Sequence, residues 1–131
     1  MSATETTATA AAPSKALHVA LWIGQLVLAA MFGMAGSMKL FSADQFPFPT
    51  ALTLFIGTVE ILGVIGVIVP ALTRIKPALT PLAALGFATI MVLAIGLHAS
   101  SGEPFTTNAL LLAVSLFVAW GRFRKAPIPA R

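Results

Sequence analysis

The chain has 131 residues, of which 58% are hydrophobic and only 9% are charged. Soluble domains carry about 25% charged residues, and a small globule buries only about two-thirds of its surface. This composition excludes a soluble enzyme, a soluble nucleic-acid-binding domain and a disordered linker. The absence of cysteine also excludes disulfides, thiol catalysis and cysteine-ligated metal. The chain is therefore predicted to be an integral membrane protein.

The N-terminal segment is rich in Ala and Thr and has no apolar periodicity, so we expect residues 1–15 to form a disordered tail. It lacks the basic start of a signal peptide, and the apolar run that follows is longer than the hydrophobic part of one. We therefore interpret that run as a retained first helix.

Charged residues divide the rest of the chain into long apolar spans, such as the 26 uncharged residues between Lys76 and Glu103. About 20 apolar residues cross a hydrocarbon core roughly 30 Å thick. We predict four transmembrane helices within a domain over 16–122, at about 17–40, 50–70, 78–98 and 106–121, with Pro70 closing the second. The runs do not alternate as in a β-barrel. Because the connections are short, the predicted fold is an all-α, antiparallel four-helix membrane bundle.

The basic residues predict the orientation of the bundle. If both termini are cytoplasmic, the outer side holds only Lys39, and the inner side holds Lys15, Arg74, Lys76, Arg122, Arg124, Lys125 and Arg131. This bias follows the positive-inside rule. The basic C-terminal tail, 123–131, is expected to be disordered. It needs no nucleic acid, because it serves as a topology determinant that can also contact anionic lipid.

Glu60 is the midpoint of the second predicted helix, about 15 Å from either surface at 1.5 Å per residue. An ionised carboxylate there costs roughly 3 kcal/mol, but the apolar residues of the span each contribute roughly −0.3 to −0.6 kcal/mol, so insertion still wins. Glu60 is either a proton-titrating or ligand-binding group, or a neutral carboxyl that hydrogen-bonds another helix. The sequence leaves both interpretations open.

Gln25 is the expected partner of Glu60, because it lies at nearly the same depth in the first predicted helix. The faces that carry these residues also contain Gly36 and Gly57, and small residues beside one polar group are typical of helix interfaces in lipid. Gln25 is then a bridge between helices or, alternatively, a substrate contact.

Lys39 and His98 lie at the outer ends of the first and third predicted helices. Direct contact between Lys39 and Glu60 is not expected unless the helices are staggered, because a combined side-chain reach of roughly 10 Å falls short of a vertical offset of about 12–15 Å. We instead expect an outer cluster of Lys39, His98, Glu103 and Asn108 that can bind a headgroup or a quinone ring. The alternative is a snorkelling lysine and an interfacial histidine. No metal site, catalytic residue or cofactor motif is predicted.

Several motifs occur in a characteristic order: Gly36-Ser-Met-Lys39-Leu40, Glu60-Ile-Leu-Gly-Val-Ile-Gly-Val-Ile-Val-Pro70, His98 with Gly102-Glu103, and Phe117-Val-Ala-Trp-Gly-Arg122. Over about residues 20–122 they resemble the DoxX-like family of small four-helix bacterial membrane proteins, most of them without assigned activity. One relative is the membrane subunit of a thiosulfate:quinone oxidoreductase, and others are linked to redox stress or membrane-protein assembly. By resemblance, Lys39, Glu60, His98 and Glu103 match recurrent polar positions of the family.

The chain departs from the family pattern at two places. Its loop at 41–50 is shorter than usual, and Ala99-Ser100-Ser101 stands where relatives often carry basic residues. The second departure argues against an anion site at that end of the third helix.

Two functions remain open. The resemblance implies an accessory or scaffold subunit of a quinone-linked or stress-related assembly in the bacterial inner membrane, without catalytic activity of its own. Its partners would be the lipid bilayer, a membrane or redox protein, or a second copy of the chain. The alternative is a small proton-coupled transporter that acts as a dimer through Glu60. Small multidrug antiporters carry their essential glutamate in the first helix, whereas this chain carries it in the second.

Reporter fusions at Asp44, Ile75, Gly102 and Arg131 test the topology. We expect signals that alternate outside, inside, outside and inside, because the basic residues hold their loops in the cytoplasm. An outside signal at Arg131 would contradict the predicted orientation.

Overall fold

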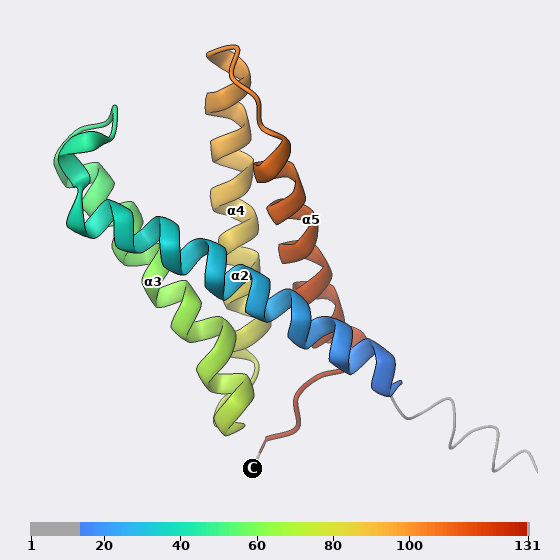
Figure 1. The fold of residues 1–131 in the computed structure, drawn as a ribbon. Helices are drawn as coiled ribbons and strands as arrows, with labels where there is room; N and C mark the ends of the chain where they lie inside the picture. The colour runs from blue at the N-terminus through green and yellow to red at the C-terminus, as the bar shows by residue number, and fades with distance from the viewer. Residues whose placement is uncertain (1–13, 131) are drawn as a thin grey trace, which may run out of the picture.

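In a computed structural model, which describes residues 14–130, the chain folds into four long helices. They are α2 (Lys15–Phe41), α3 (Thr50–Thr73), α4 (Leu79–Ser100) and α5 (Thr106–Trp120). A 3-10 turn, η1 (Ala43–Gln45), follows α2, and a π-helical turn, η2 (Gly121–Lys125), extends α5 (Figure 1). Each of the four spans is long and apolar enough to cross a membrane, so the predicted all-α membrane bundle is confirmed. Of the N-terminal tail expected to be disordered, residues 1–13 lie outside the described residues, whereas Ser14 caps α2 and Lys15 is its first residue.

Local chemistry accounts for where α2 begins and α3 ends. The hydroxyl of Ser14 accepts a hydrogen bond from the N–H of Leu17 at 2.9 Å, which satisfies a free donor in the first turn of α2. Pro70 does not close α3 as expected, since the helix continues to Thr73. It ends at Arg74, which adopts a left-handed conformation (φ 61°) and donates its N–H to the Pro70 carbonyl. A capping bond one turn later thus replaces the stop expected at the proline.

The four helices form two hairpins that meet near one end of the molecule. Helix α2 packs mainly on α3, and α4 packs mainly on α5. Figure 1 shows the hairpins crossing in the half of the bundle where α2 begins, and diverging toward the half that carries η1 and the α4–α5 loop. We call these the inner half and the outer half, after the predicted orientation.

The core lies where the hairpins cross. Phe32 of α2 stacks on Phe87 of α4 with ring centroids 4.0 Å apart and ring planes 6° from parallel. Leu28, Val67 and Val118 are fully buried around this stack. Most other large apolar side chains point outward, as expected for a surface that faces lipid.

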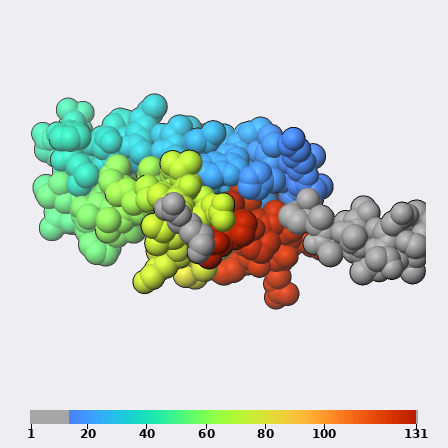
Figure 2. All heavy atoms as spheres, turned by 90° about the horizontal axis from the view of Figure 1, so that it is seen from below, coloured from blue at the N-terminus to red at the C-terminus, as the bar shows by residue number. Residues whose placement is uncertain are grey.

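The C-terminal segment covers the inner end of the bundle. Ala126 and Ile128 are buried, and the side chain of Arg74 donates to the carbonyls of Pro129 and Ala130 at 3.0 and 3.5 Å. Figure 2, a view onto this end, shows the segment lying against the α3–α4 connection. Disorder was expected after Arg122, but residues 123–130 are ordered here because apolar burial and these hydrogen bonds hold them.

Two glycines set how closely α2 approaches α3. A Cβ atom added at Gly57 would lie 2.9 Å from the Cβ of Lys39 and 3.0 Å from the backbone oxygen of Gly36. Neither neighbour can move without moving the backbone. The contact therefore depends on the missing side chain at Gly57, as in other close helix pairs in lipid.

Gly57→Ala should lower the free energy of unfolding by about 1–3 kcal/mol, because the added methyl group overpacks this contact. Gly86→Ala is the matched control, since a Cβ at Gly86 of α4 has no neighbour within 4 Å. Thermal or denaturant unfolding of the two variants in the same detergent gives the comparison. Equal stability would show that the α2–α3 contact is not tightly packed.

Candidate functional site

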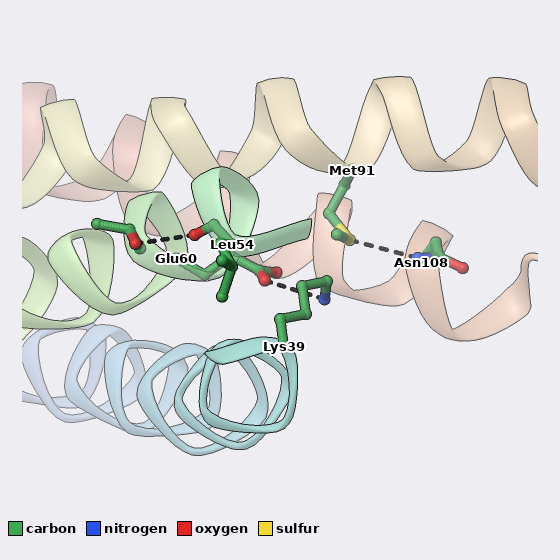
Figure 3. Close-up of polar contacts among 6 residues, drawn as sticks. Lys39, Leu54, Glu60, Met91 and Asn108 are labelled. Atoms are coloured by element: carbon green, nitrogen blue, oxygen red, sulfur yellow. Dashed lines mark hydrogen bonds and ion pairs between the residues drawn. The ribbon is translucent and has the colours of Figure 1, made fainter. Parts of the chain in front are cut away.

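Lys39 and Glu60 form an ion pair inside the membrane-spanning part of the bundle. The Nζ of Lys39 lies 3.0 Å from the Oε1 of Glu60, and the two side chains are 18% and 3% exposed. Figure 3 shows the two side chains pointing toward each other, one from α2 and one from α3. The expectation that Lys39 could not reach Glu60 is therefore wrong.

The reason lies in the register of the two helices. The depth estimate assumed that the outer ends of the first two helices are level, whereas the Cβ of Lys39 actually lies beside Gly57. Only three residues of α3, roughly 4.5 Å of helix rise, then separate the level of Lys39 from Glu60. A lysine side chain spans that offset easily.

The ion pair has one aromatic neighbour, and part of the acceptor capacity of its carboxylate is unused. The ring of Phe46, in the loop after η1, lies under the ammonium of Lys39 at 5.4 Å from Nζ, within range for a cation–π contact. The contact between Nζ and Oε1 is close, but its angles do not meet those of a hydrogen bond, and Oε1 has no other donor among residues 14–130. A buried carboxylate with spare acceptor capacity inside a membrane is a functional candidate.

Gln25 does not pair with Glu60, contrary to the sequence prediction. Its Nε2 donates to the carbonyl of Val67 at 2.9 Å, and its Oε1 accepts from the Nε of Arg122 at 2.8 Å. In the observed register Gln25 is level with Val67, which lies seven residues, or roughly 10 Å, from Glu60 along α3. The two polar groups therefore belong to separate sites.

Arg122 is the centre of the second site. Its side chain is 3% exposed, and its Nη1 lies 2.8 Å from the carbonyl oxygen of Ala126 and 3.0 Å from the Nδ1 of His18. A guanidinium can only donate, so Nδ1 accepts and the imidazole is neutral with its proton on Nε2. The ring of Trp22 lies 5.9 Å from the guanidinium carbon. We call His18, Trp22, Gln25 and Arg122 the inner polar site.

From the sequence, Arg122 was placed among the basic residues of the C-terminal cluster, and the inner polar site was not predicted. A signal was present, because His18, Trp22 and Gln25 recur at spacings of four and three and therefore share one face of α2. Gly121 packs directly on the side chain of Leu21 and brings the start of η2 against that face. The π-helical turn then directs the side chain of Arg122 inward, and such turns are frequent at functional sites.

The expected outer cluster is not brought together. The Nδ1 of His98 bonds the Ala94 carbonyl of its own helix at 2.8 Å, and the amide of Asn108 contacts the sulfur of Met91 at 3.7 Å (Figure 3). The backbone N–H of Glu103 donates to the carbonyl of His98. Within residues 14–130, no hydrogen bond or ion pair joins Lys39 to His98, Glu103 or Asn108, because Lys39 belongs to the other hairpin.

A family model described as the DoxX-like family matches residues 23–121. The chain belongs to the DoxX-like family. No curated protein and no solved structure matches this DoxX-like chain. The matched segment contains Gln25, Lys39 and Glu60, but it excludes His18 and Arg122 of the inner polar site. In the part of the DoxX-like protein that the structure describes, no three His, Asp or Glu side chains group closely enough to hold a metal ion.

Removing the charge of Lys39 and removing that of Glu60 should lower the free energy of unfolding by different amounts. Lys39→Met leaves a fully buried carboxylate without a cation and should lower the free energy of unfolding by about 3 kcal/mol, as when a buried pair loses one partner. Glu60→Gln should cost less, about 1 kcal/mol, because the ammonium of Lys39 is partly exposed and can turn toward the surface.

Unfolding of both single variants and the double variant in detergent measures the coupling. We expect Lys39→Met to be largely rescued by Glu60→Gln, since the double variant buries no charge at the pair. Strictly additive effects would show that the two side chains do not interact.

Proposed function

We propose that this DoxX-like protein is an accessory subunit of a membrane redox or stress-related assembly, and that its outer half receives a transmembrane helix of a partner. The observation that carries the proposal is the divergence of the two hairpins toward the outer half (Figure 1). Membership of the DoxX-like family supports it, since relatives by resemblance include a subunit of a quinone-linked enzyme. From the resemblance to small bacterial membrane proteins we also infer an inner-membrane location, and from the bias of basic residues we infer that both termini are in the cytoplasm.

The side-chain contacts differ between the inner and the outer half of the bundle, and this difference supports the proposal. In the inner half, contacts join one hairpin to the other, such as Phe32 on Phe87 and Arg122 on Gln25. In the outer half, Figure 3 shows two contacts that join one side chain to another. Each lies within one hairpin: Lys39 contacts Glu60, and Asn108 contacts Met91. The outer halves are thus arms that the chain's own polar contacts do not tie together.

Apolar side chains on the arms suit a partner inside the bilayer. Phe55 of α3, Leu93 and Leu97 of α4 and Leu110 of α5 are all more than half exposed. Helices in lipid associate through packing and a few polar contacts, since lipid tails are as apolar as leucine. The arms offer both, because each carries a polar pair of its own within the membrane.

The test is co-purification with a matched pair of variants. Leu97 and Leu82 both lie on α4, at its outer and inner ends, and are 54% and 52% exposed. The full chain, tagged and expressed at its native level, is purified in mild detergent and its bound membrane proteins are identified. We expect Leu97→Trp to reduce the bound partner at least fivefold, because a bulky ring blocks helix packing, and Leu82→Trp to leave it unchanged.

A wild-type protein that purifies without a partner, or equal loss in both variants, would contradict the proposal. The competing function, a proton-coupled transporter that uses Glu60, rests on the buried carboxylate of the ion pair. It predicts proton flux in liposomes that contain this protein alone, and loss of that flux in Glu60→Gln. Such a result would replace the accessory role.

A further inference from the structure

The inner polar site holds a cation that no anion of the described chain balances. The guanidinium of Arg122 contacts only neutral acceptors: the Gln25 amide, the His18 imidazole and the Ala126 carbonyl. The one ion pair within residues 14–130 joins Lys39 to Glu60, in the other half of the bundle. A buried charge without an opposite charge is costly, and chains normally avoid it.

Arg122 also keeps unused donor capacity. Its Nη2 is buried and has no hydrogen-bond partner among residues 14–130. Two N–H groups of a buried guanidinium are therefore unsatisfied, and a buried donor without an acceptor is costly, above all on a charged group. An oxyanion supplies both the missing negative charge and the missing acceptors, because guanidinium pairs with phosphate through parallel N–H···O bonds.

We propose that the inner polar site binds a phosphate group, with Arg122 as the principal ligand. His18 and Gln25 hold the guanidinium of Arg122 in place. His18 lies about one helical turn from the start of α2 and Gln25 about three turns from it, so the site extends from the inner end of the bundle into its membrane-spanning part. The same end of the bundle carries Arg74, Lys76 and Lys125, which attract an anionic headgroup.

The segment 126–130 acts as a cover over this site. The carbonyl of Ala126 occupies a position on Nη1 that a phosphate oxygen can take over. The cover is anchored by the buried side chain of Ile128 and by the bonds from Arg74 to Pro129 and Ala130. Binding of phosphate exchanges a neutral acceptor for a charged one and releases the cover.

The experiment uses the full chain in a non-ionic detergent and follows the fluorescence of Trp22. The chain has two tryptophans, so Trp120→Phe leaves Trp22, beside the guanidinium, as the only reporter. Three probes are titrated: phosphatidylglycerol, the matching diacylglycerol that lacks phosphate, and inorganic phosphate. We expect a saturable response to phosphatidylglycerol and none to diacylglycerol. A response to inorganic phosphate as well identifies the ligand as a free anion rather than a lipid headgroup.

Arg122→Gln and Arg124→Gln are the matched variants, since both remove one positive charge two residues apart, but only Arg122 is buried. We expect the affinity for phosphatidylglycerol to fall at least tenfold in Arg122→Gln and to change less than twofold in Arg124→Gln. Equal effects in the two variants, or an equal response to diacylglycerol, would overturn the site.

Ile128→Ser provides a second test that changes no charge and does not touch the site itself. Loosening the cover should raise the affinity about threefold, because less work is needed to displace it. If Arg122→Gln does not fold, an unchanged affinity in Ile128→Ser overturns the proposal.

Discussion

The contact between Gly36 and Gly57 is the constraint on which the other features of the bundle depend. Without side chains at these positions, the backbones of α2 and α3 approach until the backbone oxygen of Gly36 lies 3.0 Å from where a Cβ of Gly57 would be. Close approach fixes the register of the first hairpin, since sliding by one turn would drive larger residues into the gap. That register brings Lys39 to Glu60 and Gln25 to Val67. These two pairings place the polar side chains that lie between α2 and α3.

The cations of Lys39 and Arg122, which both lie inside the bundle, are stabilised in opposite ways. Lys39 has a carboxylate partner and an aromatic ring beneath it, and its ammonium stays partly exposed. Arg122 has neither a carboxylate partner nor an exposed guanidinium, and it donates only to neutral acceptors. An ion pair inside a membrane is costly to break, whereas a set of neutral acceptors can be exchanged one at a time. The outer pair therefore resists change, and the inner polar site permits it.

Composition and charge spacing were sufficient to predict the membrane class, the four helices and most of their ends, because hydropathy over a span of fixed length depends only on local sequence. The faces of the first two helices were also recognisable from their glycines. The register was not, because a depth estimate assumes level helix ends, while the true offset depends on how Gly57 packs against Lys39. The burial of Arg122 was not predicted either, because it depends on a π-helical turn and on a C-terminal segment that folds back over it.

The stacked rings of Phe32 and Phe87 give the bundle a mechanical property. Their planes are within 6° of parallel, and they lie where the two hairpins cross. The fully buried side chains of Leu28, Val67 and Val118 close around the rings, so the stack holds the two hairpins at one crossing. From Phe87 to the outer end of α4 at Ser100 the helix extends for about 20 Å, so a change of about 5° in the crossing angle would displace the end of α4 by roughly 2 Å. The separation of the two arms in the outer half therefore depends on how these two rings pack.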